Sequence, residues 1–228
     1  MKRIGLIGGL GPESTVDYYR IIINEYRDKM RGNAPEIIIY SLNLAEFPGM
    51  NQKHKLIEWL AGAIKLLYRA GADFAVITAN TPHIVFTEVD ALSPIPLVSI
   101  VEETCQVVRN LNFKKVGLLG TKVTMGGEFY QRVFSRHDIS IVVPTPQEQD
   151  YINDKLVSEI VYNRIVDETR ERLLQIARRL IDDDGIEGLI LGCTELPLIL
   201  PDEAFGIPFL NTAKIHAHSV VRFCLTGE

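Results

Sequence analysis

Short apolar runs alternate with longer amphipathic stretches along the whole chain. The apolar runs are nearly continuous in hydrophobicity and end at turn-forming residues, which is typical of strands buried on both faces of a parallel sheet. The predicted strands are residues 3–7, 36–41, 74–78, 97–100, 116–120, 140–144, 189–191 and 209–210. Helical periodicity occupies residues 12–31, 51–70, 101–110, 126–136, 151–184 and 212–225. This alternation predicts a doubly wound α/β fold with right-handed crossovers.

Several motifs occur twice, in the same order and at nearly constant spacing. Residues 2–9 are echoed by residues 114–121, 71–81 by 185–195, and 95–99 by 207–211, at offsets of 112, 114 and 112. We therefore expect an internal duplication that gives two pseudo-symmetric, doubly wound parallel-sheet domains, with the active site in the cleft between them. The first half would comprise residues 1–100 and the second 101–211, while 212–228 would pack back on the first.

The composition of the chain argues against several classes of function. The 228 residues carry a net charge of −5 with scattered Lys and Arg, so they lack the basic stripe that nucleic-acid binding requires. The apolar run at residues 4–10 is too short to span a membrane, and we expect a cytoplasmic protein. Three cysteines without CxxC spacing predict neither a disulfide framework nor a zinc site. Any cysteine chemistry would come from a single thiol.

The repeated motifs fall where chemistry is expected in this class of fold. Parallel α/β sheets bind ligands beyond the carboxyl ends of their strands, in the loops that lead into helices. The four loops that combine this position with polar residues are 8–15, 80–83, 121–124 and 193–195. We expect a pseudo-twofold arrangement to bring them together.

The glycine-rich loop 8–15 lacks the third glycine of a dinucleotide fingerprint and the Gly-Lys-Ser/Thr of a P-loop. Two interpretations remain open for it. Backbone N–H groups around Gly11, at a helix N-terminus, could bind a carboxylate. Alternatively, the loop is a tight turn that caps the helix, with Pro12 in its first turn.

Five residues in the other loops offer small uncharged donors. They are Asn80, Thr81, Thr121, Thr124 and Thr194. Such groups, together with backbone amides at helix starts, suit a small carboxylate held without a metal. Asn and Thr are also ordinary helix caps, so a structural role stays open, most of all for Thr121 and Thr124.

Cys193 is the candidate reactive group. A helix is predicted at residues 196–200, and a thiol at its N-terminus is expected to have a lowered pKa and to act as a base or nucleophile. Cys105 and Cys224 lie within helical stretches and are expected to be buried structural residues. His216 and His218 are two residues apart, which is poor spacing for a metal pair, although His216 alone could lie near the site. His83, three residues past Asn80, could point toward the cleft, but packing within a helix is the favoured role.

These residues resemble the aspartate/glutamate racemase family over nearly the whole chain. The resemblance rests on residues 4–9 with Gly11, on Asn80-Thr-Pro-His83, on residues 117–121 and most specifically on Gly192-Cys-Thr-Glu195. It implies a homodimeric, cofactor-independent racemase that binds a small acidic amino acid or dicarboxylate. Two cysteines would face each other across the substrate, one removing the Cα proton while the other delivers one. Cys193 is then the second cysteine, supported by Glu195, while Asn80, Thr81, Thr121 and Thr194 hold the substrate.

The chain departs from this pattern at Ala79, which stands where the first cysteine is expected. Thr78 is no simple replacement, because successive side chains on a strand face opposite sides. The basic residue that some members use for the distal carboxylate is also not evident in residues 159–163, and Lys155 or Arg164 would have to serve. Three functions therefore stay open: a racemase with reduced activity, a one-sided Cys-dependent decarboxylase, and a catalytically impaired dicarboxylate-binding homologue.

Overall fold

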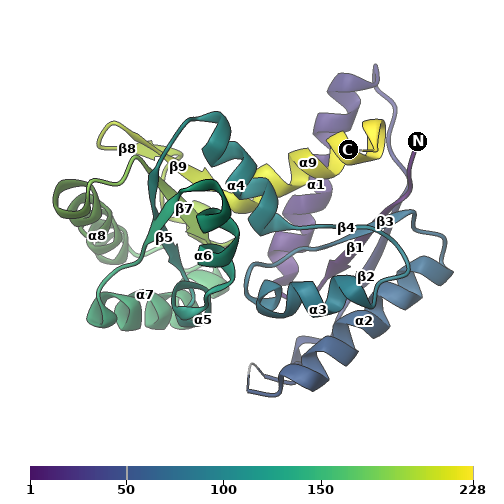
Figure 1. The fold of residues 1–228 in the computed structure, drawn as a ribbon, viewed down its shortest axis with the longest axis horizontal. Helices are drawn as coiled ribbons and strands as arrows, with labels where there is room; N and C mark the ends of the chain where they lie inside the picture. The colour runs from purple at the N-terminus through teal and green to yellow at the C-terminus, as the bar shows by residue number, and fades with distance from the viewer. Residues whose placement is uncertain (50, 228) are drawn as a thin grey trace. The chain divides into compact units, whose positions relative to one another are not determined.

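The computed structural model describes residues 1–49 and 51–227 of the chain, which form two compact units (Figure 1). The first unit comprises Met1–Glu103 and Ala213–Glu228, and the second comprises Thr104–Thr212. Between them the chain passes twice, once within helix α4 (Ile100–Asn110) and once at the start of helix α9 (Thr212–Thr226). Each unit is therefore described by itself.

The first unit is built on a parallel four-stranded sheet of order β2-β1-β3-β4. Its strands are β1 (Ile4–Gly8), β2 (Ile37–Ser41), β3 (Phe74–Ile77) and β4 (Leu97–Val98). Its helices are α1 (Pro12–Lys29), α2 (Lys53–Arg69) and α3 (Phe86–Ala91), with short 3₁₀ segments η1 (Leu44–Glu46) and η2 (Thr81–Val85).

Side chains alternate between the two faces of this sheet. Ile4 and Val76 pack against α1 and the C-terminal helix α9, which Figure 1 draws beside α1. Ile7 and Ile77 instead pack against α2 and α3. Both faces are buried, as the continuous apolar runs predict.

The second unit repeats the strand order of the first. Its sheet runs β6-β5-β7-β9, with an additional strand, β8, at the edge. The strands are β5 (Lys115–Gly120), β6 (Ser140–Val142), β7 (Gly188–Gly192), β8 (Glu203–Ala204) and β9 (Ile207–Asn211), all parallel except β8. The predicted doubly wound, parallel α/β fold with two sheets is thus confirmed.

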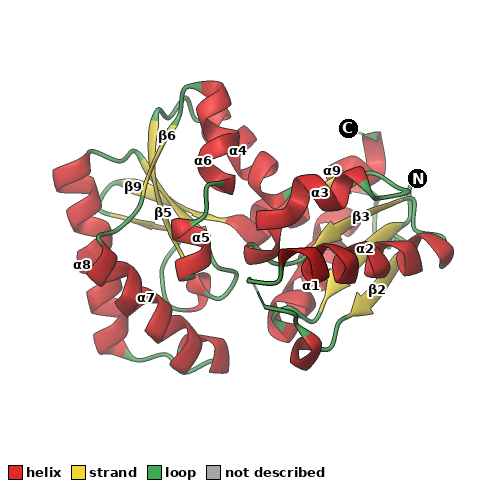
Figure 2. Cartoon of the chain, turned by 60° about the horizontal axis from the view of Figure 1, so that its bottom comes forward, coloured by secondary structure: helices red, strands yellow, loops and turns green. Residues whose placement is uncertain are grey.

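Helices cover both faces of the second sheet as well. They are α5 (Lys122–Gly126), α6 (Phe129–Phe134), α7 (Pro146–Ser158) and α8 (Asp167–Asp184), with 3₁₀ segments η3 (Ser135–His137), η4 (Ile160–Tyr162) and η5 (Leu196–Leu198). In both views α7 and α8 lie on one side of the sheet and α6 on the other (Figures 1 and 2). The core on the α7 and α8 side includes Leu119, Leu156, Leu173 and Leu191.

Two predicted helices are each divided in the structure, and one observed strand was not predicted, each for a local reason. The single helical stretch 151–184 is two helices, because the Thr145–Glu148 capping box starts α7 early and Asn163 adopts a left-handed conformation (φ 56°) between them. The stretch 126–136 is divided at Gly127, where the chain is extended between α5 and α6. The short edge strand β8 was not predicted, and it turns back to β9 through Phe205 and Gly206, both at positive φ.

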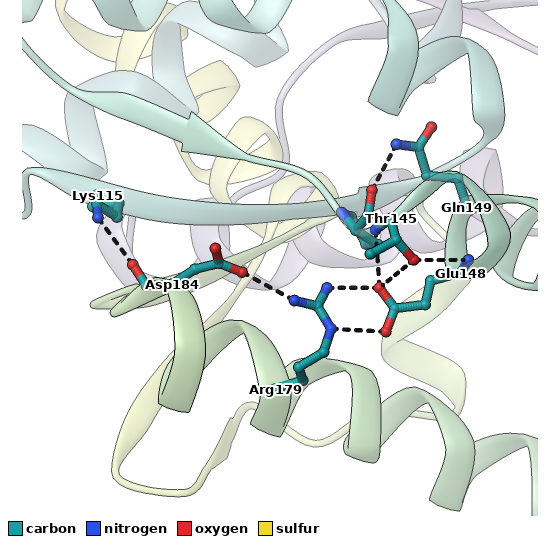
Figure 3. A network of polar contacts seen from close by, with 7 residues as sticks. Lys115, Thr145, Glu148, Gln149, Arg179 and Asp184 are labelled. Atoms are coloured by element: carbon teal, nitrogen blue, oxygen red, sulfur yellow. Dashed lines mark hydrogen bonds and ion pairs between the residues drawn. The ribbon is translucent and has the colours of Figure 1, made fainter.

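A polar network joins α7 to α8 (Figure 3). Arg179 on α8 donates to both carboxylate oxygens of Glu148, at 2.9 and 2.6 Å, and to Asp184 at 3.1 Å. Burial raises the pKa of Glu148, but the bonds from Arg179 and Thr145 outweigh burial and hold this pKa below its ordinary value. Such bidentate Arg–carboxylate pairs restrict the relative orientation of the two side chains more than a single hydrogen bond does.

We predict that Arg179→Met lowers the free energy of unfolding by about 2 kcal/mol, because it leaves the largely buried Glu148 carboxylate without its main partner. Arg178→Met is the matched control on the same helix, since the pair of Arg178 with Asp182 is exposed on both sides. That change should cost no more than about 1 kcal/mol. Urea unfolding of both variants checks the difference, and equal losses would contradict the structural role given to Arg179.

Candidate functional site

The carboxyl ends of β1 and β3 carry the candidate residues of the first unit. Gly9 has a φ of 81°, and a Cβ there would lie 2.2 Å from the carbonyl oxygen of Leu42, so the position requires glycine. The Gly9 N–H donates to the Thr15 hydroxyl at 3.0 Å. The Gly11 carbonyl accepts from the Ser14 hydroxyl at 2.8 Å and from the Thr15 backbone at 3.2 Å. These bonds are those of a turn that opens helix α1.

Thr78 and Ala79 follow directly after β3. The Thr78 hydroxyl donates to the carbonyl of Ile7 at 3.0 Å and lies 3.5 Å from the Thr15 hydroxyl, so it faces the interior between β1 and α1. Thr78 is fully buried, and Ala79 is buried except for 7% of its surface. The only side-chain atom at position 79 is a methyl carbon, which neither accepts nor donates a proton.

Asn80 and Thr81 follow at the start of the 3₁₀ segment η2. Asn80 is buried and occupies the cap position, with Pro82 in the first turn, while Thr81 is half-buried. The carbonyl of Asn80 accepts from the backbone of His83 at 3.0 Å. This turn therefore sets the direction of both candidate side chains.

His83, which belongs to this turn, and His216 are both buried. His83 Nδ1 is 2.9 Å from the carbonyl oxygen of Ala79, and His83 Nε2 accepts from the backbone of Ile100 at 3.3 Å. His216 Nε2 is 3.0 Å from the carbonyl oxygen of Val98, and its Nδ1 is 2.9 Å from the Tyr18 hydroxyl. Burial lowers the pKa of His83 to about 3, with a further contribution from His216, and lowers that of His216 to about 4. Both rings are therefore neutral at ordinary pH.

The second unit presents Thr121 and Thr124 at the end of β5. Thr121 caps α5: its hydroxyl accepts from the Thr124 backbone at 3.2 Å and lies 3.1 Å from the Thr124 hydroxyl. Thr124 is fully buried, whereas Thr121 is half-buried. Only Thr121 of this pair thus has surface that a ligand could reach directly.

Gly120 and Gly192 allow the ends of β5 and β7 to approach closely. The two residues are partners in the parallel ladder. A Cβ on Gly120 would lie 2.9 Å from the Gly192 carbonyl oxygen, and a Cβ on Gly192 would lie 2.9 Å from that of Leu119. The residues that follow each strand, Thr121 and Cys193, are thereby held next to paired strand ends.

Cys193, Thr194 and Glu195 form a compact hydrogen-bonded group after β7. The Cys193 thiol donates to Glu195 Oε2 at 3.0 Å, and the Thr194 hydroxyl donates to the same oxygen at 2.9 Å. Cys193 and Glu195 are both buried, with 9% and 8% of their surface exposed. A thiol and a carboxylate thus share a hydrogen bond at the rim of the sheet.

The expectation of a lowered Cys193 pKa is wrong. Burial raises this pKa well above its ordinary value, and the charge of Glu195 and the bond to its carboxylate raise it further, against a smaller opposite effect of the backbone N–H groups of Thr194 and Glu195. The predicted helix at 196–200 is a three-residue 3₁₀ segment, η5, so no developed helix dipole faces the sulfur. In this state Cys193 is a protonated thiol.

Lys155 and Arg164 are the two basic residues expected to bind a distal carboxylate. The Lys155 ammonium bonds Glu159 at 2.5 Å, and the other oxygen of Glu159 accepts from Thr169 at 2.7 Å. The hydrogen bond with Lys155 lowers the pKa of Glu159, with Arg164 adding a smaller electrostatic effect. Lys155 is therefore already engaged with a carboxylate of its own chain.

Comparison with known proteins assigns the family. Residues 7–220 match the Asp/Glu/Hydantoin racemase family. The chain belongs to this family. The broad-specificity amino-acid racemase RacX of Bacillus subtilis is 25% identical over 225 residues, covering 96% of both chains. None of the helices in residues 1–49 and 51–227 is long and apolar enough to cross a membrane.

Solved structures agree with this assignment. A candidate Asp/Glu racemase from Yersinia pestis superposes with a TM-score of 0.91 at 30% identity, covering 99% of this chain and 100% of that one. An aspartate racemase homologue from Pyrococcus horikoshii superposes with a TM-score of 0.87 at 35% identity, covering 98% and 99%. The resemblance read from the sequence motifs is thus confirmed at the level of the family and of its racemase-type function.

Two features of the site go beyond the expectations from the sequence. The resemblance implied that Glu195 supports Cys193, but the direct bond between them depends on a turn geometry that spacing does not reveal, although the two-residue separation was a signal that the side chains could meet. For His83, packing within a helix was favoured over a position facing the cleft, and its bond to the backbone of the candidate loop was not predicted. Its separation of four residues from Ala79, across a proline-containing turn, was the available signal.

We predict that Glu195→Gln increases the reactivity of Cys193 toward iodoacetamide at pH 8.5 by roughly three- to tenfold, because removing the nearby charge lowers the thiol pKa and raises the thiolate fraction. Mass spectrometry of the peptide containing Cys193 measures the rate. Labelling of Cys224 in the same samples is the internal control and should not change. An unchanged or slower rate at Cys193 would show that Glu195 does not hold the thiol in its protonated form.

Proposed function

We propose that the protein is a cofactor-independent amino-acid racemase that transfers the Cα proton of an acidic amino acid, with Cys193 as its thiol acid/base. The observation that carries this proposal is the buried bond between the Cys193 thiol and Glu195. General acid–base catalysis requires a group that can both hold and release a proton near the substrate. Membership in a racemase family and the similarity to RacX support an amino-acid substrate.

Glu195 is proposed as the group that makes the thiol a usable base. Moving the proton from sulfur to Glu195 Oε2 gives a thiolate and a neutral carboxylic acid without creating net charge. The thiolate then takes the Cα proton, and the electron pair stays on Cα, delocalised into the substrate carboxylate. A water molecule protonates the opposite face of Cα, and the hydroxide formed is neutralised by the proton held on Glu195. The starting thiol and carboxylate are thereby restored.

The substrate carboxylate is proposed to bind to uncharged donors. These are the backbone at Gly11, the side chains of Asn80, Thr81, Thr121 and Thr194, and their neighbouring backbone amides. Thr124 would act through Thr121, because it is fully buried and bonded to the Thr121 hydroxyl. Such preorganised donors stabilise the negative charge that develops as the Cα proton leaves.

A decarboxylase of the same fold is the second candidate. Ala79 favours it, because a methyl group at the position where the family pattern has a second cysteine offers no second acid or base. In that reaction the substrate loses CO₂, and the Cys193 thiol delivers a proton to the carbanion on one face only. Release of CO₂ from 2-substituted malonates, with solvent deuterium entering a single enantiomer, would identify this activity. A chain that binds aspartate without any Cys193-dependent exchange would instead be a binding homologue.

Incubation with L- or D-aspartate in D₂O should place deuterium at Cα of both enantiomers, as followed by NMR and chiral chromatography. Cys193→Ser should slow this exchange by at least about a hundredfold, because an unassisted hydroxyl is a far weaker base than a thiolate. Cys224→Ser is the matched control, since Cys224 is also a buried thiol but bonds the carbonyl of Lys2 in the first unit. Exchange in one enantiomer only would reject the racemase in favour of the one-sided enzyme.

We predict that Ala79→Cys raises the racemisation rate by more than about tenfold, which corresponds to roughly 1.4 kcal/mol of barrier. The new thiol would replace water as the proton carrier on the second face. Ala79→Ser adds a group of similar size without a thiol and should leave the rate within about threefold. Chiral chromatography of aspartate turnover checks both variants. An equal gain from serine would mean that space filling, and not proton transfer, limits the reaction.

A further inference from the structure

His83 is held at both ring nitrogens by backbone groups. Because the Ile100 N–H is a donor, Nε2 of His83 must accept, so the ring proton lies on Nδ1 and is donated to the Ala79 carbonyl. The ring also stacks on Phe86, with centroids 5.0 Å apart and planes 5° apart. His83 is buried, with 3% of its surface exposed. One side chain therefore fixes two backbone segments that are far apart in the sequence.

The second histidine, His216, bonds the backbone at the end of β4. Since the Val98 carbonyl can only accept, the ring proton of His216 lies on Nε2, and Nδ1 accepts from the Tyr18 hydroxyl. The two imidazole rings are 6.3 Å apart in an edge-on arrangement. Val98 and Ile100 flank a single residue at the junction of β4 and α4. The start of α4 is thus tied to the candidate loop by His83 and to α1 and α9 by His216.

We propose that His83 is a positioning residue for the reaction, one that aligns the loop of Ala79, Asn80 and Thr81 with the start of α4. This inference rests on the proposed function, because only in that proposal does the loop of residues 79–81 hold substrate. A phenylalanine could fill the same volume against Phe86. What the imidazole adds is a donor to the Ala79 carbonyl and an acceptor for the Ile100 N–H. His83 acts through the backbone of residues 79–81 and does not touch the reacting atoms.

Three substitutions separate the two bonds of His83. In His83→Asn, the amide nitrogen occupies the place of Nδ1 and can still donate to the Ala79 carbonyl. His83→Gln places its amide near Nε2, where its oxygen can accept from Ile100 but its nitrogen no longer reaches Ala79. His83→Phe removes both bonds and keeps the ring. The Asn variant should keep KM for aspartate within about threefold, while the Gln and Phe variants should raise KM at least about tenfold.

Tyr18→Phe is the matched control for stability. It deletes one buried hydrogen bond in the same network, to His216, but none to the loop of residues 79–81. It should lower the melting temperature while leaving KM unchanged. An increase in KM with Tyr18→Phe as large as that with His83→Phe would overturn the proposal, because the effect would then follow stability alone.

Amide hydrogen exchange of residues 79–85 gives a readout that needs no turnover. Protection of these amides should be retained in His83→Asn and lost in His83→Gln and His83→Phe, with α1 and α2 unchanged in all three variants. Equal protection in all variants would overturn the positioning role. Absence of Cys193-dependent exchange in the wild-type protein would instead reject the proposed function, and loop protection would still decide the role of His83.

Discussion

The central strands of both sheets are short, parallel and buried on both faces, and this constraint governs where the protein can place polar chemistry. Strand residues such as Ile4, Val76 and Leu191 face helices on either side, so no functional group fits along the strands themselves. The candidate polar side chains instead lie at the carboxyl ends, where the backbone leaves the sheet. Thr78, Thr121 and Cys193 each come directly after a strand. Fold and candidate chemistry therefore follow from the same pattern of burial.

This constraint explains why much of the molecule could be predicted. Runs such as residues 74–78 and 116–120 consist almost entirely of apolar residues and glycine. Their spacing along the chain predicted the α/β class without any tertiary information. The repeated motifs also predicted two similar parallel sheets, and the order β2-β1-β3-β4 recurs as β6-β5-β7-β9. Helix boundaries were less accessible. They depend on individual caps, such as the Thr145–Glu148 box, and on single left-handed residues such as Asn163.

The electrostatics of the site could not be predicted for a different reason. A helix N-terminus lowers a thiol pKa only when several aligned peptide dipoles face it, and the segment after Cys193 is a three-residue 3₁₀ turn. Burial and the carboxylate of Glu195 act in the opposite direction and prevail. Sequence spacing placed the right residues together, but the sign of their interaction depends on whether the Glu195 side chain turns toward the sulfur. That direction is a property of the folded loop.

The raised pKa of Cys193 changes how the difference between Cys193 and Ala79, at equivalent positions of the two halves, is interpreted. A thiol with a lowered pKa would start as a base, and its missing partner would have to be the acid. In the proposed reaction Cys193 instead starts as an acid, and Glu195, which accepts a hydrogen bond from the thiol, takes up its proton. Both halves of an acid–base pair are then present within one loop of the second unit. Ala79 removes a proton carrier from the first unit, but Asn80, Thr81 and the backbone that His83 holds are retained there. In the proposed reaction the second unit therefore supplies both the proton chemistry and some of the substrate donors, while the first unit supplies only donors.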